Sequence, residues 1–261
     1  MRGKDIVGIF NLLVIVGVLG AISYAALVLQ PDEYDPETLC LTGEPSPHLA
    51  VVIDKTDRYS GPEAERIRDL ILDARDQLAV GERLSLYELD ENGRLSDAQR
   101  FSMCNPGRGD QINPLYRNPA RVETRYQEYF EGPLARRLAD LVEPKDAPRS
   151  PILESLARLA NQDVFAPGLP RREVVLVSDM LQNSDLFTVY GAARWDLSRL
   201  PDPARVAEEL EYEYGDALAG VRLTVYLIPR PGWEQAQRTA LPEYWNAVFA
   251  DLGIRVRWRA L

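Results

Sequence analysis

Two short apolar runs that each end in an aspartate constrain the fold of this chain more than any other feature. The first run is residues 49–54 (LAVVID), and the second is residues 173–179 (EVVLVSD). A continuous apolar run of this length is typical of a strand that is buried on both faces, as in a parallel sheet. Helical patterns separate the two runs, so the sequence predicts strands and helices that alternate along the chain.

The rest of the sequence extends this alternation. Ser60 and Glu63 have the spacing of a capping box, and the apolar positions behind them predict a helix whose Ile67 and Ile71 face a core. Further strands are predicted at residues 83–89, 98–104, 221–228 and 254–258. Further helices are predicted at residues 124–142, after Pro151, at 203–220 and at 233–252, with a bend near Gly132 and a break at Pro242. This order indicates an α/β fold with a doubly wound, Rossmann-like, mostly parallel sheet that helices cover on both faces.

Residues 6–29 form a long apolar run without a charged side chain. A membrane-spanning helix needs about 20 apolar residues, whereas the apolar core of a cleavable signal has roughly 7–15. An uncleaved transmembrane helix is therefore the preferred interpretation, and small residues near the end of the run leave cleavage as the alternative. Arg2 and Lys4 precede the run, and basic flanks stay in the cytoplasm. The remainder of the chain is expected on the periplasmic or extracellular side.

This interpretation divides the chain into four segments. Residues 1–5 are expected to be a cytoplasmic N-terminus, and residues 6–29 the transmembrane helix. Residues 30–47 are rich in proline and acidic side chains and are expected to form a short stalk. Residues 48–261 are expected to form the α/β domain.

The few cysteines and the single histidine limit the possible chemistry. Cys40 and Cys104 are the only cysteines and His48 is the only histidine, which excludes zinc sites rich in either residue. A non-cytoplasmic location permits a disulfide between the two cysteines; two free thiols are the alternative. His48 lies in a proline-flanked stretch, where a buried base is not expected.

Charge and motif content argue against nucleotide and nucleic-acid binding. The formal net charge is −10, so the chain offers little attraction for a phosphate backbone. Neither a dinucleotide-binding glycine pattern nor a Walker loop follows the first predicted strand. No nucleic-acid partner is expected.

Polar side chains that could hold a cation follow the predicted strands. Asp54 and Asp179 each end a buried strand, and Ser150 lies at a junction between a loop and a helix. In doubly wound sheets, ligands bind beyond the carboxyl ends of the strands. If the two strands are neighbours, carboxylate and hydroxyl oxygens surround one point, and such oxygens suit Mg²⁺.

With these residues the sequence resembles the von Willebrand factor A-like (vWA) domains over residues 48–261. That family carries an Asp-x-Ser-x-Ser motif after its first strand, a Thr or Ser before a later helix, and an Asp after its fourth strand. Asp54 and Thr56 occupy the first two motif positions, Ser150 the middle position and Asp179 the last. The resemblance implies a metal-ion-dependent adhesion site formed by these four residues, with Mg²⁺ as the expected ion and other divalent cations left open.

The chain departs from the family pattern at Arg58, which stands where the last Ser of the first motif is expected. An arginine beside a cation would repel it or fill its place, so the site is expected to be degenerate. Asp57 and Ser60 are possible additional ligands, although Ser60 also suits a helix cap. Ser150 could equally cap the helix that follows it, and the two aspartates could accept backbone N–H bonds without any ion.

Fold and site together favour a non-enzymatic function. The first hypothesis is a membrane-anchored module that binds or scaffolds another protein on the non-cytoplasmic side, through a divalent cation or without one. The alternatives are a metal-dependent hydrolase or phosphatase with Asp54 as nucleophile, and a structural domain with a vestigial metal site. Phosphatases of the haloacid-dehalogenase type need a second Asp two residues after the first, where this chain has Thr56.

Two charged segments allow more than one interpretation. Arg255, Arg257 and Arg259 alternate along the last predicted strand. Such charges protect an edge strand from pairing with other chains, and a docking surface for an acidic partner is the alternative. Residues 208–214 carry four glutamates and are expected to form a solvated helix face.

Overall fold

A computed structural model gives the fold of the chain as two compact units, Met1–Tyr34 and Asp35–Leu261. It describes residues 3–28, 34–56, 58–95, 101–112, 114, 118–141, 147–191, 193–194 and 196–261. The first unit contains helix α1 (Gly3–Val28), and the expected end of the membrane segment, Leu29, lies outside the described residues. Within the described ranges, no helix combines the length and the hydrophobicity needed to cross a membrane.

The second unit is built around a six-stranded sheet with the order β3-β2-β1-β4-β5-β6. Its strands are β1 (His48–Asp54), β2 (Arg83–Leu89), β3 (Phe101–Cys104), β4 (Arg172–Ser178), β5 (Arg222–Leu227) and β6 (Arg255–Ala260). Each neighbouring pair is parallel except β2 and β3, which are antiparallel. The predicted α/β class with a mostly parallel sheet is confirmed.

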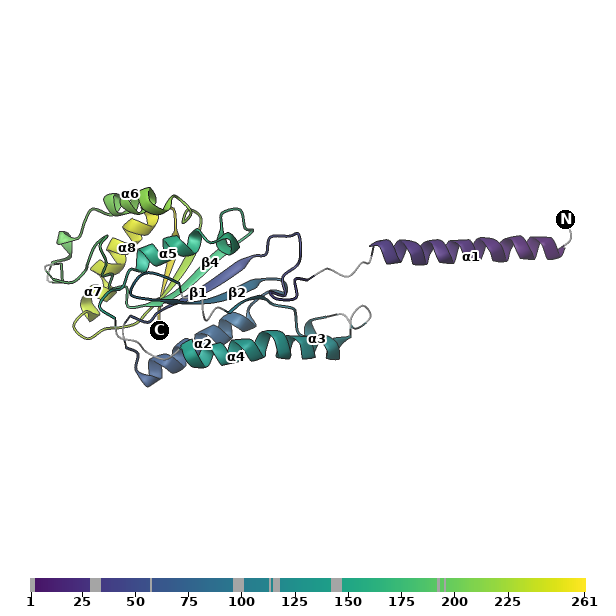
Figure 1. The fold of residues 1–261 in the computed structure, drawn as a ribbon, viewed down its shortest axis with the longest axis horizontal. Coiled ribbons are helices and arrows are strands. Elements are labelled where there is room, and N and C mark those ends of the chain that lie inside the picture. The colour runs from purple at the N-terminus through teal and green to yellow at the C-terminus, as the bar shows by residue number, and fades with distance from the viewer. Residues whose placement is uncertain are drawn as a thin grey trace. The chain divides into compact units, whose positions relative to one another are not determined.

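Helices cover the two faces of this sheet (Figure 1). They are α2 (Gly61–Asp76), α3 (Pro119–Tyr126), α4 (Gly132–Leu141), α5 (Ile152–Ala160), α6 (Pro203–Tyr214), α7 (Glu234–Arg238) and α8 (Ala240–Asp251). On one face, Ile67, Ile71 and Phe130 belong to a core that includes α2. On the other face, Leu156 and Trp245 belong to a core shared by α5, α6 and α8. These separate cores explain why the buried strands are apolar on both sides.

Some predicted helix limits differ from the observed ones for local reasons. The helix that begins after Asp202 ends at Tyr214 and not at Gly220, because Gly215 adopts a positive φ of 75° that stops it. Pro242 lies in the first turn of α8, where a missing N–H costs nothing, so the break in this region falls at Thr239 instead. A π turn (Gln127–Glu131) separates α3 from α4 just before the predicted bend.

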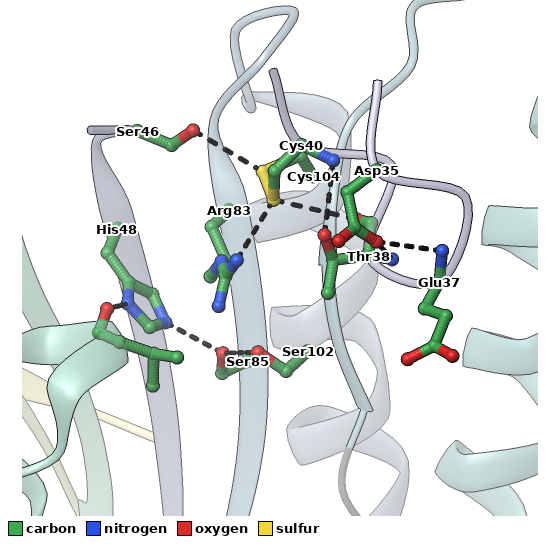
Figure 2. Close-up of a disulfide and its surroundings, with 11 residues drawn as sticks. Asp35, Glu37, Thr38, Cys40, Ser46, His48, Arg83, Ser85, Ser102 and Cys104 are labelled. Carbon is green, nitrogen blue, oxygen red and sulfur yellow. Dashed lines mark hydrogen bonds between the residues drawn. A yellow bond between two sulfur atoms is a disulfide. The ribbon is translucent and has the colours of Figure 1, made fainter. Parts of the chain in front are cut away.

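The cysteines form the expected disulfide, which joins Cys40 to Cys104 at the end of β3 (Figure 2). The backbone N–H of Cys104 also donates to the carbonyl of Thr38, at 2.8 Å, and Leu39 is buried. Residues 35–41 therefore belong to the compact unit, although the sequence assigned them to a stalk. The disulfide and the backbone bond both join this segment to residue 104, which is distant in sequence. The compact unit therefore begins at Asp35, whereas the sequence predicted a domain that begins at His48.

His48 is fully buried as the first residue of β1, contrary to the sequence expectation. Its Nδ1 lies 2.6 Å from the carbonyl of Val164, which can only accept, so Nδ1 carries the proton. Nε2 then accepts from Ser85 Oγ at 2.7 Å, and Ser102 Oγ lies 2.8 Å from Ser85 Oγ (Figure 2). Burial lowers the pKa of His48 to about 4, although the bond to Val164 opposes this shift. This neutral histidine is a structural group at the amino end of β1.

Candidate functional site at the carboxyl edge of the sheet

The two predicted aspartates meet at one edge of the sheet. Asp54 is the last residue of β1, and Asp179 directly follows β4. These strands are parallel neighbours, with Ile53 paired to Val177. The chain reverses its direction of strand addition between β1 and β4, so this is the switch point where doubly wound sheets bind ligands.

Asp54 is the centre of a buried hydrogen-bond network and is 3% exposed. One of its oxygens, Oδ1, accepts from the Thr56 hydroxyl at 2.6 Å and from the Thr56 backbone N–H at 3.1 Å. The other, Oδ2, accepts from the Ser178 hydroxyl at 2.8 Å and from the Ser150 hydroxyl at 3.2 Å. The structure therefore brings three of the four predicted site residues into direct contact: Asp54, Thr56 and Ser150.

The environment of Asp54 acts on its pKa in two directions. Burial raises the pKa of this carboxyl, and the hydrogen bonds from Thr56, Ser178 and Ser150 lower it, with burial the larger effect. All four donors named above are uncharged. The carboxylate is thus held by neutral dipoles within the fold.

Ser178 was missed by the sequence reasoning, although it precedes Asp179 in the same buried run. As the last residue of β4 it is fully buried. Its hydroxyl bonds Asp54 and also accepts from the backbone N–H of Met180, at 2.9 Å. A small polar residue at the carboxyl end of a buried strand was the available signal.

Asp179 is held differently, by an arginine. Arg230 Nε donates to Asp179 Oδ2 at 2.8 Å, and the Leu181 backbone N–H donates to Oδ1 at 2.9 Å. The side chain of Asp179 is 2% exposed and that of Arg230 is 15% exposed. Arg230 also donates to the backbone carbonyl of Arg58 at 2.8 Å. One guanidinium therefore ties the loop after β5 to the loops after β4 and β1.

Arg230 was not singled out from the sequence, but its position carried a signal. It follows β5 by three residues, so the rule that led to Asp54 and Asp179 applies to it as well. The same strand-end rule that predicts acids at this edge also predicts a basic side chain there.

The backbone after β4 is fixed in an unusual conformation. Met180 has a φ of 62°, a region that costs free energy for a residue with a side chain. Trp245 Nε1 donates to the Met180 carbonyl at 3.1 Å, and Gln237 Nε2 donates to the Asp179 carbonyl at 2.9 Å. These contacts from α7 and α8 hold the loop that presents Asp179.

Of the two possible additional ligands, the structure describes only Ser60. Ser60 caps α2: its Oγ accepts from the Glu63 N–H, and its own N–H donates to the Glu63 carboxylate at 2.6 Å. This supports the capping interpretation of Ser60 over the ligand interpretation. Asp57 lies outside the described residues.

The residues present do not fit a divalent cation at this edge. A cation would need Asp179 as an anionic ligand, but the Arg230 guanidinium already contacts that carboxylate at 2.8 Å. Like charges this close repel strongly when buried. Arg58 also replaces the expected serine. In the part of the chain that the structure covers, no group of three or more His, Cys, Asp or Glu side chains is arranged to hold a metal.

A hollow opens beside the network. Its volume is about 240 Å³, and it is lined by Thr56, Ala147, Pro148, Arg149, Ser150, Asn183 and Tyr190. Backbone bonds between Ser150 and Asn183, at 2.9 and 3.0 Å, fix one wall. The hollow offers hydroxyl, amide and guanidinium groups together with an aromatic ring, a composition that suits contact with another protein.

Comparisons with known proteins give fold-level similarity only. No protein-family model matches the chain, and no curated protein matches it. Similar solved structures include the conserved hypothetical protein BatB from Bacteroides thetaiotaomicron (10% identity, TM-score 0.36, 82% of this chain and 91% of that one). A second is a von Willebrand factor type A protein from Catenulispora acidiphila (15% identity, TM-score 0.37, 76% of this chain and 42% of that one). A third is the human COPII-coat protein Sec24c (9% identity, TM-score 0.40, 82% of this chain and 29% of that one). The chain spans less than half of each of the latter two, and its fold assignment rests on its own strand order.

Proposed function

We propose that this chain is a vWA-like protein-interaction module that engages another protein through the carboxyl edge of its sheet. The observation that carries the proposal is the open hollow lined by Thr56 and Ser150, two residues that hold the buried carboxylate of Asp54 within the fold. A site of this kind presents a rigid polar surface. Such a surface suits recognition more than bond cleavage.

The buried state of Asp54 disfavours the hydrolase alternative. A carboxylate nucleophile needs an oxygen that a substrate can approach, and both oxygens of Asp54 accept two hydrogen bonds each. Thr56, which stands where a haloacid-dehalogenase-type enzyme needs its acid, is occupied in bonding Asp54. We therefore propose a non-enzymatic function.

The partner contact is proposed to be independent of divalent cations. Arg230 supplies a positive charge at Asp179, the position that the family resemblance assigned to a metal ligand. Binding of Mg²⁺ stays a prediction from the sequence, and the Arg230–Asp179 pair argues against it.

We further propose that residues 6–29 anchor the domain in a membrane, with the domain on the non-cytoplasmic side. The support is the uncharged apolar run itself, the basic residues before it and the exposed apolar side chains along α1. The Cys40–Cys104 disulfide agrees with an oxidising compartment.

Carbonate extraction of membranes tests this proposal: the full chain should stay in the pellet, and a chain without residues 2–29 should not. A full chain released by carbonate would contradict it.

Site-specific photo-crosslinking tests the interaction surface. The photoreactive residue benzoyl-phenylalanine replaces Tyr190, which lines the hollow. In the matched control it replaces Tyr129, which is exposed in the π turn. We expect a defined crosslinked protein with the probe at position 190 only, and the same yield with EDTA present. Equal products at both positions, or none at position 190, would contradict the proposed surface. A product that EDTA abolishes would restore a role for a cation.

A further inference from the structure

A groove opens on the sheet face that packs against α2. It has a volume of about 290 Å³ and is lined by Leu49, Leu70, Asp73, Ala74, Gln77, Leu78, Glu82, Arg171, Glu173, Val175, Thr224 and Tyr226. α2 therefore forms one wall, and β4 and β5 form the floor. Val175 and Tyr226 on the floor are only partly buried. Faces of parallel sheets are normally covered, so this floor is a candidate for contact with another chain.

A row of arginines lies on β6, the strand that pairs with β5 of the groove floor, and this row is called the rim below. In the β5–β6 register, Thr224 pairs with Arg257 and Tyr226 pairs with Arg259. Side chains alternate along a strand, so Arg255, Arg257 and Arg259 share the face of the groove floor, while Val256 packs towards the opposite core. All three arginines are exposed.

The arginines near the groove floor have ion-pair partners, and those of the rim do not share them. Arg171 pairs with Glu82 and Arg222 pairs with Glu173, so the charges of these four side chains compensate each other. In the described part of the chain, no ion pair engages any of the three β6 arginines. The rim is thus a row of three positive charges on a chain with a net charge of −10.

The outer face of α6 carries negative charges, opposite in sign to the arginine row. Val206, Ala207 and Leu210 pack this helix into the core on the opposite side of the sheet. Its exposed positions carry Glu208, Glu209, Glu211 and Glu213. Among them lies Tyr212, which is 95% exposed, more than any other large hydrophobic side chain in the described residues.

We propose that the groove between α2 and the arginine row receives helix α6 of a second copy of this chain. The glutamates of the incoming helix lie against the β6 arginines, and Tyr212 covers the partly buried floor at Val175 and Tyr226. Both surfaces belong to one chain but lie on opposite sides of its sheet, so they meet only between copies. A two-fold contact between two arginine rows would place like charges together, whereas a head-to-tail contact pairs opposite charges.

Charge reversal in the full chain, purified in detergent, tests this assembly by analytical ultracentrifugation. Arg255→Glu with Arg257→Glu, or Glu209→Lys with Glu213→Lys, should each weaken self-association about tenfold or more. A chain with all four changes restores opposite charges and should associate again. All four substituted side chains are exposed. Misfolding of the two double variants would not be repaired by combining their changes, so recovered association in the chain with four changes indicates restored charge pairing. Raising the salt concentration to 1 M should dissociate the wild-type assembly, since the Debye length then falls to about 3 Å.

Matched controls change the same number of charges elsewhere. Glu128 and Asp251 are exposed outside α6, and their replacement by Lys should leave association unchanged. Arg121 and Arg238 are exposed outside β6, and their replacement by Glu should do likewise. Association that these controls weaken equally would show a general charge effect and overturn the proposal.

Cysteine crosslinking tests whether β6 of one copy lies against α6 of another copy. A mixture of an Arg257→Cys chain and a Tyr212→Cys chain should form a mixed disulfide-linked dimer, and the Arg257→Cys chain alone should form little. Dimers of the Arg257→Cys chain alone would indicate a two-fold contact and overturn the head-to-tail arrangement. A chain that stays monomeric at all concentrations would also overturn it. Binding of such a monomer to phosphatidylglycerol vesicles through the β6 arginines would assign the groove rim to lipid instead.

Discussion

Arg230 lies 2.8 Å from Asp179 and joins the loop after β5 to the loop after β4. The pair occupies the edge of the sheet at which Asp54 ends β1. Both strand-end carboxylates are thus satisfied by the chain itself, Asp54 by hydroxyl and N–H groups and Asp179 by a guanidinium. These contacts fix the position of both side chains at this edge of the sheet.

The first prediction concerns metal response. Arg230→Ala removes the guanidinium that lies 2.8 Å from the carboxylate of Asp179, which is 2% exposed. Loss of one partner of a buried ion pair costs about 3–5 kcal/mol. We expect Mn²⁺ to recover part of this loss, because an ion can then approach Asp179 without repulsion. The melting temperature in the presence and absence of Mn²⁺ measures the effect.

The controls for this prediction are the wild type and Arg238→Ala, an exposed arginine of α7. Neither should respond to Mn²⁺. At 100 times its dissociation constant a ligand adds about 2.7 kcal/mol of stability, so a response would be visible. A wild-type chain that Mn²⁺ stabilises to that extent would contradict the cation-independent site.

The second prediction concerns the buried ion pair of Lys55 and Glu88. Lys55 Nζ lies 3.1 Å from Glu88 Oε1, with side chains 3% and 6% exposed. Lys55→Met should lower the free energy of unfolding by about 3–5 kcal/mol, because it removes the ammonium group that lies 3.1 Å from a buried carboxylate. The double change Lys55→Met with Glu88→Leu should be less destabilising than Lys55→Met alone. Urea unfolding of the four chains in this cycle measures the coupling, and additive losses would refute it.

The third prediction concerns acid stability and His48. Its pKa of about 4 in the fold lies below the usual value near 6.5, so the unfolded chain binds a proton at a pH where the folded chain does not. Stability contributed by the neutral histidine is therefore present above pH 6.5 and is lost as the pH falls towards 4. Between pH 7 and pH 5 the loss should be about 2 kcal/mol.

The matched variant for this measurement is His48→Gln, which keeps a donor and an acceptor but does not titrate. Urea unfolding at pH 7 and pH 5 should show a smaller pH dependence for this variant than for the wild type. Equal pH dependence in both chains would mean that His48 does not contribute.

The fourth prediction concerns the disulfide. Cys40 and Cys104 are 64 residues apart, and closing a loop of this size in the unfolded chain contributes about 2–4 kcal/mol. Replacing both cysteines by Ser should lower the free energy of unfolding by that amount. It should also release residues 35–41, which hydrogen exchange would report as faster exchange at Thr38–Cys40. Unchanged exchange there would indicate that the backbone contacts hold this segment unaided.

The sequence predicted the sheet and much of the candidate site for a local reason. A buried parallel strand must be apolar along its whole length, so residues 49–54 and 173–179 were recognisable. The acids at their ends were then placed by the rule that ligands bind at strand carboxyl ends. The predicted cap at Ser60 and the predicted disulfide at Cys104 are also present, because a capping box has a fixed spacing and the chain has a single pair of cysteines.

The sequence by itself determined the alternation of strands and helices and the position of Asp54 and Asp179 at strand ends, because both follow from the periodicity of short segments. Only the tertiary structure decided that Arg230 pairs with Asp179, that His48 is buried, and that residues 35–41 join the domain. Each of these depends on contacts between segments that are distant in the chain. Such contacts are set by which strands become neighbours and how the helices pack on them, and no local pattern encodes that choice.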